Sequence, residues 1–194
     1  EKVNGQPHAN AIGNHLGIWD FYYTKKNKSN ILKFYYQHFF EDTSGLRFAN
    51  RLDGLWGFEY RDLSSGLNFL MEYLNTSNQD RDPPYVSENY YNHGEYTLGW
   101  SYKGYVIGNP FINNINNNPS KVIHAGISNN DFNNYKFKIL LSKRIDNSNT
   151  LMYSFSIGKI FENFTTSFYI NGMKSEDMGL RILFMLRLCK ESVL

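Results

Sequence analysis

Apolar and polar residues alternate with a period of two along much of this chain. In the clearest run, apolar residues of one parity are interleaved with mainly polar ones of the other, Tyr135, Phe137, Ile139 and Leu141 against Lys136, Lys138, Leu140 and Ser142. Successive side chains of a β-strand point to opposite faces of the sheet, so this pattern predicts strands with one apolar and one polar face. The segments that alternate well are residues 32–37, 56–61, 67–74, 96–103, 135–142, 151–158, 164–171 and 178–188.

Strand length then favours a membrane barrel. Residues 16–23 and 121–128 are also expected to be strands, although they alternate poorly, which gives about ten strands of roughly nine to eleven residues. A strand of that length, tilted by about 45°, crosses the hydrocarbon layer of a membrane. Aromatic residues, which favour strands, make up 17% of the chain. No run approaches the roughly 20 apolar residues of a membrane-spanning helix.

We therefore predict an all-β fold, an antiparallel transmembrane β-barrel that occupies residues 1–194 as a single domain. The chain would supply about ten strands of a larger barrel, or an incomplete barrel. The alternative is a large soluble β-sandwich, whose strands also alternate. No initiating Met or apolar leader opens the chain, so we expect that a signal peptide was removed or belongs to an upstream part.

Connections between the expected strands are of unequal length. Residues 62–66 and 146–149 are tight, turn-forming runs, whereas residues 41–53 and 75–94 are long and polar. Residues 108–120 contain two Asn-Pro steps and are expected to be a loop. Barrels of bacterial outer membranes have short periplasmic turns and longer outer loops. With ten strands and a periplasmic C-terminus, however, the long loops would fall on the periplasmic side, so at least one strand of this count is expected to be wrong.

Most chemical functions have no support in the sequence. A single cysteine, Cys189, excludes an internal disulfide framework and a cysteine-based metal site, and the five histidines are too dispersed for a zinc site. We predict no metal, no cofactor and no catalytic residue, and a net charge of +2 gives no indication of nucleic-acid binding. The pairs Asp80 with Asp82 and Glu41 with Asp42 are weak candidates for glycoside hydrolysis. His38 lies on the apolar parity of its segment and is expected to be an interfacial histidine rather than a partner of a nucleophile.

Several segments resemble a known family. They are Tyr-Tyr-Gln-His-Phe-Phe-Glu-Asp-Thr-Ser-Gly-Leu-Arg-Phe at residues 35–48, Leu-Asp-Gly-Leu-Trp-Gly at 52–57, Tyr-Tyr-Asn-His-Gly at 90–94, Gly-Trp-Ser-Tyr at 99–102 and Gly-Asn-Pro-Phe at 108–111. Together they resemble the capsule assembly Wzi family of outer-membrane barrels, in the form found in Bacteroidetes, most strongly over residues 15–112. Members are much longer, with about eighteen strands, so the resemblance implies the C-terminal portion of such a barrel. The terminal aromatic usual in bacterial barrels is missing after Leu188.

The resemblance implies a lectin-like, non-enzymatic barrel in the bacterial outer membrane that binds or retains capsular or other surface polysaccharide. It supplies no established ligand residues. The long loops carry the charged and aromatic groups that sugar binding needs, and from them we take as candidate polysaccharide-binding residues Arg47, Arg51, Asp53, Arg81, Tyr90, Tyr91 and His93. For any one residue, a solvated charge that pairs locally is the simpler explanation. The expected partners are surface polysaccharide, outer-membrane lipid and other subunits of an outer-membrane complex; the alternative function is a porin-like channel or a scaffold subunit.

The alternation also predicts which face of the sheet each residue occupies. Facing lipid would be Phe137, Ile139, Phe155, Ile157, Phe184 and Leu186, and facing inward Lys138, Ser154, Ser156, Arg181 and Arg187. The lumen would be polar and slightly cationic, lined by Lys33, Arg61, Lys103, Lys136, Lys138, Arg181 and Arg187. A slip of one residue in the pairing would invert all these assignments.

Overall fold

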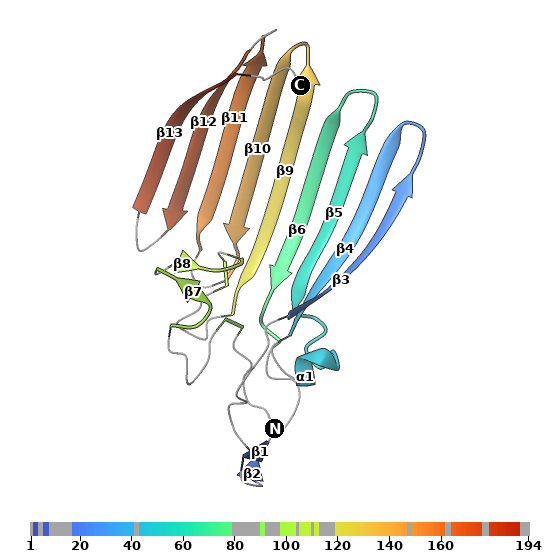
Figure 1. Cartoon of the computed structure of the whole chain (residues 1–194), viewed down its shortest axis with the longest axis vertical. Helices are drawn as coiled ribbons and strands as arrows, with labels where there is room; N and C mark the ends of the chain where they lie inside the picture. Colours follow the sequence, from blue (N-terminus) through green and yellow to red (C-terminus); the bar gives the residue numbers. More distant parts are fainter. Residues whose placement is uncertain are drawn as a thin grey trace. The chain divides into compact units, whose positions relative to one another are not determined.

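The computed structural model of the chain describes residues 2–3, 6–7, 17–40, 43–78, 90–91, 98–103, 105–109, 111–112, 119–146, 149–161, 164–175 and 179–190. Its main element is a nine-stranded sheet in the order β13-β12-β11-β10-β9-β6-β5-β4-β3 (Figure 1). The strands are β3 (Gly17–Lys26), β4 (Asn30–Phe40), β5 (Gly54–Asp62), β6 (Leu67–Asn75), β9 (Lys121–Phe132), β10 (Tyr135–Arg144), β11 (Leu151–Ile160), β12 (Phe164–Ser175) and β13 (Gly179–Lys190).

The remaining elements are short. Strand β1 (Lys2–Val3) pairs with β2 (Gln6–Pro7), and β7 (Ser101–Tyr102) pairs with β8 (Tyr105–Val106). A single-turn helix, α1 (Thr43–Leu46), follows β4. Within the described ranges, no helix is long and apolar enough to cross a membrane.

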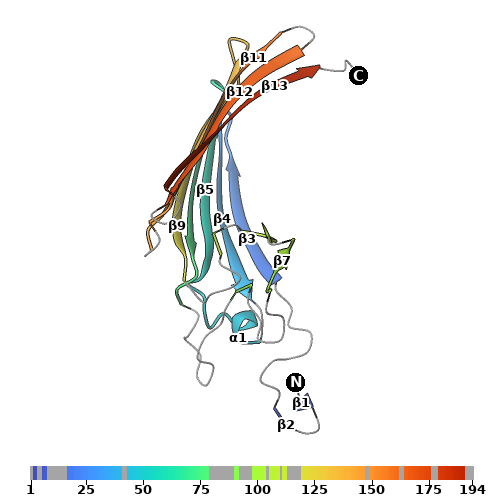
Figure 2. The same cartoon turned by 90° about the vertical axis from the view of Figure 1, so that its left-hand side faces the viewer.

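The predicted all-β antiparallel fold is confirmed. Strands of the main sheet are 9 to 12 residues long, against a predicted length of roughly nine to eleven. Among the described residues, β3 and β13 end the strand order and the sheet is not closed, so the structure is consistent with part of a β-barrel. Figure 2 shows β11, β12 and β13 curved along their length, as strands of a coiled sheet are.

The pairing of β10 to β13 fixes which side chains share a face. Directly opposed residues of antiparallel strands point the same way. One row across these strands is Phe137, Ile157, Phe168 and Leu186, and the next row of the same face is Ile139, Phe155, Ile170 and Phe184. The opposite face carries Lys138, Ser154, Ser156, Arg181 and Arg187. The predicted separation into an apolar and a polar face is therefore confirmed for these strands.

The apolar face stays exposed. Ile139 is 43% exposed, Phe184 62% and Leu186 72%. A β-sandwich would bury this face against a second sheet, and contiguous exposed apolar surface of this extent is rare on a soluble monomer. The structure therefore favours the barrel over the soluble sandwich.

The expected strand at residues 96–103 was wrong. Gly99 and Lys103 have positive φ angles of 55° and 50°, and only Ser101–Tyr102 form a strand there, paired with β8. Lys103 consequently lies outside the main sheet and is not one of its polar-face cations. Removing this segment leaves nine strands in the sheet, where we had expected ten. The segments that alternate poorly, at residues 16–23 and 121–128, are parts of the long strands β3 and β9.

Short turns join the strands at one end of the sheet, where the strands begin and finish. Asn133 and Asn134 both have positive φ, 52° and 66°, which a two-residue hairpin turn requires. At the β5–β6 turn, the Asp62 carboxylate accepts hydrogen bonds from the Ser64 backbone N–H at 2.9 Å and the Ser65 hydroxyl at 2.8 Å. Because consecutive neighbouring strands are antiparallel, the long connections, residues 41–53 and 76–120, leave from the opposite end of the sheet. The shorter connection at 145–150 leaves from that end too.

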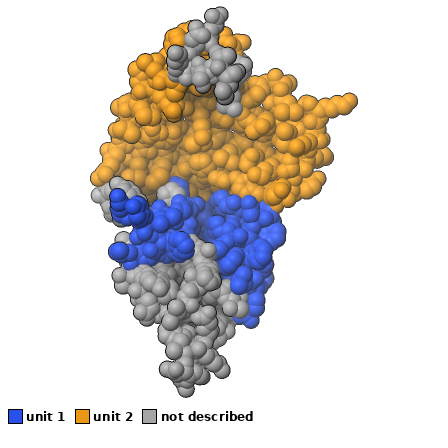
Figure 3. Space-filling model, viewed as in Figure 1, with its two compact units in different colours: residues 1–21, 36–55, 74–121 blue, residues 22–35, 56–73, 122–194 orange. Residues whose placement is uncertain are grey.

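The chain forms two compact units, coloured in Figure 3. Unit 1 comprises residues 1–21, 36–55 and 74–121, and unit 2 comprises residues 22–35, 56–73 and 122–194. Unit 1 contains most of the buried large side chains, Phe39, Leu74, Tyr90, Tyr91 and Ile112. Unit 2 contains the greater part of the sheet, where many apolar side chains are exposed.

Candidate functional site

The seven candidate binding residues fall into three groups. Arg47 and Arg51 are exposed, in the turn that follows α1. Asp53, Tyr90 and Tyr91 are buried, with 0%, 2% and 6% of their surface exposed. Arg81 and His93 lie outside the described residues. Of the described candidates, only the two arginines are therefore placed to touch a large ligand arriving from solvent.

Asp53 connects segments that are far apart in the sequence. Its Oδ1 accepts hydrogen bonds from the backbone N–H of Asn78 at 2.8 Å and from the Asn78 side-chain amide at 3.3 Å. Its Oδ2 accepts a hydrogen bond from the Tyr90 hydroxyl at 3.1 Å. A buried carboxylate is costly unless it is hydrogen-bonded, and these donors meet that requirement. Asp53 thus holds the residues after β6, and Tyr90 further along, against the start of β5.

Burial also changes the acidity of this carboxyl. Removal from water raises the pKa of Asp53 above its usual value, because burial disfavours the charged form. The hydrogen bonds from Asn78 and Tyr90, and the charge of His38, act in the opposite direction. The net shift is upward.

The hydroxyl groups of the two tyrosines are hydrogen-bonded to other residues of unit 1. The Tyr90 hydroxyl accepts a hydrogen bond from the Asn50 side-chain amide, and its ring meets Phe39 edge-on at 5.8 Å. The Tyr91 hydroxyl accepts a hydrogen bond from the Asn109 backbone N–H at 3.0 Å. Both rings therefore pack and bond internally, which assigns them a supporting place at the site.

His38 is fully buried, so the expectation of an interfacial histidine was wrong. Its Nε2 lies 2.8 Å from the Gly45 carbonyl oxygen, which only accepts, so Nε2 carries a proton. Its Nδ1 lies 2.9 Å from the Tyr36 hydroxyl, and its ring stacks on Phe48 at 4.4 Å. The histidine fixes the turn after α1, and both ring nitrogens are engaged in doing so.

Tyr36 holds the same turn from its other end. Its hydroxyl lies 2.7 Å from the Arg51 carbonyl oxygen and 2.9 Å from the Asp53 carbonyl oxygen. The backbone between Gly45 and Asp53 is therefore held at both ends from β4. A guanidinium group binds carboxylates in a planar, two-pronged geometry. Arg47 and Arg51 accordingly present such groups from a turn whose backbone is fixed beneath them.

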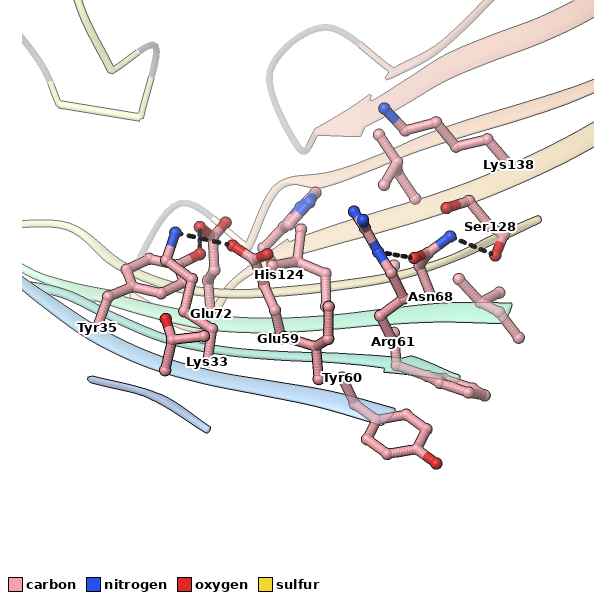
Figure 4. Close-up of a pocket in the computed structure, with 17 residues that line it drawn as sticks. Lys33, Tyr35, Glu59, Tyr60, Arg61, Asn68, Glu72, His124, Ser128 and Lys138 are labelled. Atoms are coloured by element: carbon pink, nitrogen blue, oxygen red, sulfur yellow. Dashed lines mark hydrogen bonds and ion pairs between the residues drawn. The ribbon is translucent and has the colours of Figure 1, made fainter. Parts of the chain in front are cut away.

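A second candidate lies within unit 2, on the polar face of the sheet. A hollow of about 520 Å³ is lined by residues of β3, β4, β5, β6, β9 and β10 (Figure 4). We call it the sheet hollow. Its charged and polar lining residues include Lys33, Tyr35, Glu59, Arg61, Asn68, Glu72, His124, Ser128 and Lys138. The predicted polar face with Lys33, Arg61 and Lys138 is thus present, but two carboxylates accompany those cations.

Charges in the sheet hollow are separated along the strands. At one end of Figure 4, Lys33 Nζ lies 3.4 Å from Glu59 Oε1, and the Tyr35 hydroxyl donates to the Glu72 carboxylate. At the other end, Arg61 Nε donates to Asn68 Oδ1 at 2.8 Å. Lys33 Nζ also lies 4.8 Å from the centre of the Tyr35 ring, within cation–π range.

The sequence contains one indication of this hollow, the polar residues that share a parity within each strand. Lys33 and Tyr35, Glu59 and Arg61, and Asn68 and Glu72 each share one parity of a strand. Alternation alone predicts that such residues share a face, but not which strands lie next to each other. The strand order, with β6 beside β9 across the long connection, brings the groups together.

Comparisons with known proteins place the chain in a family. The family model described as capsule assembly protein Wzi matches residues 2–125. No curated protein and no solved structure was found to match the chain. Within the described ranges, no group of three or more His, Cys, Asp or Glu side chains is arranged to hold a metal ion.

Proposed function

The chain belongs to the Wzi family of capsule assembly proteins, and from that premise we propose that it binds or retains surface polysaccharide without catalysis. Membership of this family indicates a general role in capsule assembly at the outer membrane. The finer proposal is a lectin-like barrel in the bacterial outer membrane whose long loops contact the glycan. Its partners would be capsular polysaccharide, outer-membrane lipid and other subunits of an outer-membrane complex.

The observation that carries this proposal is the pair Arg47 and Arg51. Both side chains are exposed, and the backbone that bears them is held by Tyr36 and His38 from β4. A fixed backbone lowers the entropy lost when a ligand binds. Guanidinium groups held in this way suit the carboxylates of an acidic polysaccharide. Arg81 and His93 of the following loop are proposed to contribute to the same contact, and Asp53, Tyr90 and Tyr91 to support it from beneath.

Topology supports an outward position for these loops. The connections at residues 41–53 and 76–120 leave from one end of the strands, and the turns at 27–29, 63–66 and 133–134 lie at the other end. Bacterial outer-membrane barrels keep short turns on the periplasmic side and longer loops outside. The arginine-bearing turn would then face the cell surface.

Replacing both arginines by alanine tests the proposal. We expect the double variant Arg47→Ala, Arg51→Ala to retain less acidic capsule on whole cells, with barrel stability changed by less than about 0.5 kcal/mol. The matched control is Lys25→Ala, Lys28→Ala, which removes two positive charges on β3 and at a short turn. Unchanged capsule retention in the arginine variant, with the barrel assembled normally, would remove these residues from the site. Solute flux through the full-length protein in liposomes, without glycan binding, would instead favour a channel.

A further inference from the structure

The two ends of the sheet hollow differ in charge balance. Glu59 is paired with Lys33, and Glu72 accepts from the Tyr35 hydroxyl. Among the residues that the structure describes, no carboxylate lies within ion-pair distance of Arg61 or Lys138. Both cations line the hollow. The end that contains Arg61 and Lys138 therefore carries two cations that no described carboxylate pairs with.

Asn68 orients the guanidinium of Arg61. Its Oδ1 accepts from Arg61 Nε at 2.8 Å, while its amide donates to the Gly66 carbonyl oxygen at 3.1 Å and the Ser128 carbonyl oxygen at 3.4 Å. Ser128 is the direct partner of Lys138 in the pairing of β9 with β10. A continuous set of contacts across β5, β6, β9 and β10 thus fixes where the Arg61 side chain lies relative to the strand that carries Lys138.

Among the residues that the structure describes, Arg61 is hydrogen-bonded through Nε to Asn68, and neither terminal nitrogen of its guanidinium has a hydrogen-bond partner there, so both can reach a ligand. A guanidinium that presents two N–H groups side by side matches the two oxygens of a carboxylate. Lys138 adds a point charge on the same face. The hydroxyl of Tyr35, the carboxylate of Glu59 and the imidazole of His124 lie in the same hollow and suit sugar hydroxyl groups. Its volume of about 520 Å³ is within the range of small-molecule sites.

We propose that the sheet hollow is a binding site for a carboxylate-bearing sugar unit, with its carboxylate between Arg61 and Lys138 and its hydroxyls toward Glu59 and Tyr35. Asn68 is a positioning residue, because it acts through Arg61. The inference rests on the proposed function for the class of ligand, a glycan, but concerns residues of the sheet face that are separate from the loop arginines. It assigns the chain a contact with single sugar units in addition to the contact with polymer at the loops.

The test is equilibrium binding of a hexuronate, glucuronate, to the purified full-length protein in detergent. Arg61→Gln and Lys138→Gln should each weaken binding by about tenfold or more, since a hydrogen bond to a charged group of this kind is worth a factor of that order. Asn68→Ala should weaken glucuronate binding less than Arg61→Gln does. Asn68→Asp should not restore the binding that is lost in Asn68→Ala. The matched control is Lys159→Gln, which removes one positive charge from the opposite face, in the row that contains Tyr135. That variant should bind glucuronate as the parent does.

The probes and variants separate the possible outcomes. Glucose should bind far more weakly than glucuronate; equal binding of both sugars would show that the carboxylate is not recognised and would overturn the inference. Tighter binding of inorganic phosphate than of glucuronate, lost in the same variants, would replace the sugar site by a phosphate site. Equal loss in Lys159→Gln would reduce the effect to overall charge. Retained glucuronate binding in Arg47→Ala, Arg51→Ala would show that the hollow is independent of the loops, so that either proposal can fail alone.

Discussion

Asp53 illustrates why a charged loop residue need not be a contact residue. In the sequence it stands among the acidic and basic residues of a long polar connection. In the structure it is fully buried and accepts hydrogen bonds from Asn78 and Tyr90. Its side chain fixes the loops that carry the proposed binding residues. Mutating it would therefore affect ligand binding through the loop conformation.

Substitutions of Asp53 should distinguish its hydrogen bonds from its charge. Asp53→Ala leaves the buried Tyr90 hydroxyl and the Asn78 N–H without their acceptor, and we expect a loss of about 1–3 kcal/mol in the free energy of unfolding. Asp53→Asn keeps an acceptor for Asn78 and should cost less. Denaturant titration of both variants measures the difference, and equal costs would show that the hydrogen bonds are not what matters.

The raised pKa of Asp53 gives a pH dependence with a definite sign. Since the folded pKa lies above the usual value of 3.8, the folded protein binds this proton more tightly than the unfolded chain. The stability contribution is full below pH 3.8 and is lost as the pH rises through the folded pKa. The difference in unfolding free energy between the parent and Asp53→Asn should therefore shift toward the parent on acidification. A difference that is constant from about pH 4 to 7 would contradict this assignment.

Gly57 makes room for the aromatic ring that lines the sheet hollow. A Cβ at this position would lie 1.9 Å from Cζ of Tyr35, far inside van der Waals contact. Gly57→Val should therefore displace the ring, break the hydrogen bond from Tyr35 to Glu72 and destabilise the protein by about 1–3 kcal/mol. The double variant Gly57→Val, Tyr35→Ala should be less destabilised than the sum of its single changes. Additive effects in thermal denaturation would argue against this contact.

At the scale of the strand, alternation predicts faces well and turns poorly. The rows through Phe155 and Ser154 lie where their parity predicts. Residues 98–103 fail because Gly99 and Lys103 adopt positive φ and turn the chain, which a pattern of side-chain polarity does not record. At Asn129 the pattern of polarity is interrupted although the strand continues. This residue interrupts the apolar parity of β9, yet its amide donates to the Ser65 carbonyl oxygen at 2.6 Å and secures the adjacent hairpin.

The candidate site was only partly predictable for a related reason. The sequence indicates where charge and tyrosine are dense, and this density points to Arg47, Arg51, Asp53 and Tyr90. Burial depends on segments that meet only after folding, and Asp53 meets Asn78 and Tyr90 across 25 and 37 residues. The sheet hollow needs the neighbour relation of β6 and β9, which local patterns do not contain.

Arginine scanning of one strand tests the assignment of its two faces. Phe155 lies in the apolar row with Ile139 and Ile170, and Ser154 lies on the polar face beside Leu140 and Asn171. Phe155→Arg should cost about 2–4 kcal/mol if the residue sits near the bilayer midplane, whereas Ser154→Arg should cost little. Refolding titrations into lipid vesicles measure both. A larger penalty at Ser154 than at Phe155 would invert the assignment of lipid and lumen faces.

At the scale of the whole chain, the strand order decides at which end of the sheet each connection lies. Because neighbouring strands are antiparallel in this nine-stranded meander, β13 finishes at the end of the sheet that carries the short turns. The same sheet order supports both proposals, since residues 41–53 and 76–120 then leave the same end of the sheet and the polar side chains share the face that we propose lines a lumen.

Labelling of single cysteines on intact cells tests the central claim that the long loops face outward from an outer-membrane barrel. In a Cys189→Ser background, Leu52→Cys places a thiol in the turn that bears the arginines, and Lys28→Cys places one at a short turn; both positions are exposed. A membrane-impermeant maleimide should label Leu52→Cys on intact cells and Lys28→Cys only after the outer membrane is permeabilised. The reverse pattern, or equal labelling of both before permeabilisation, would contradict the account.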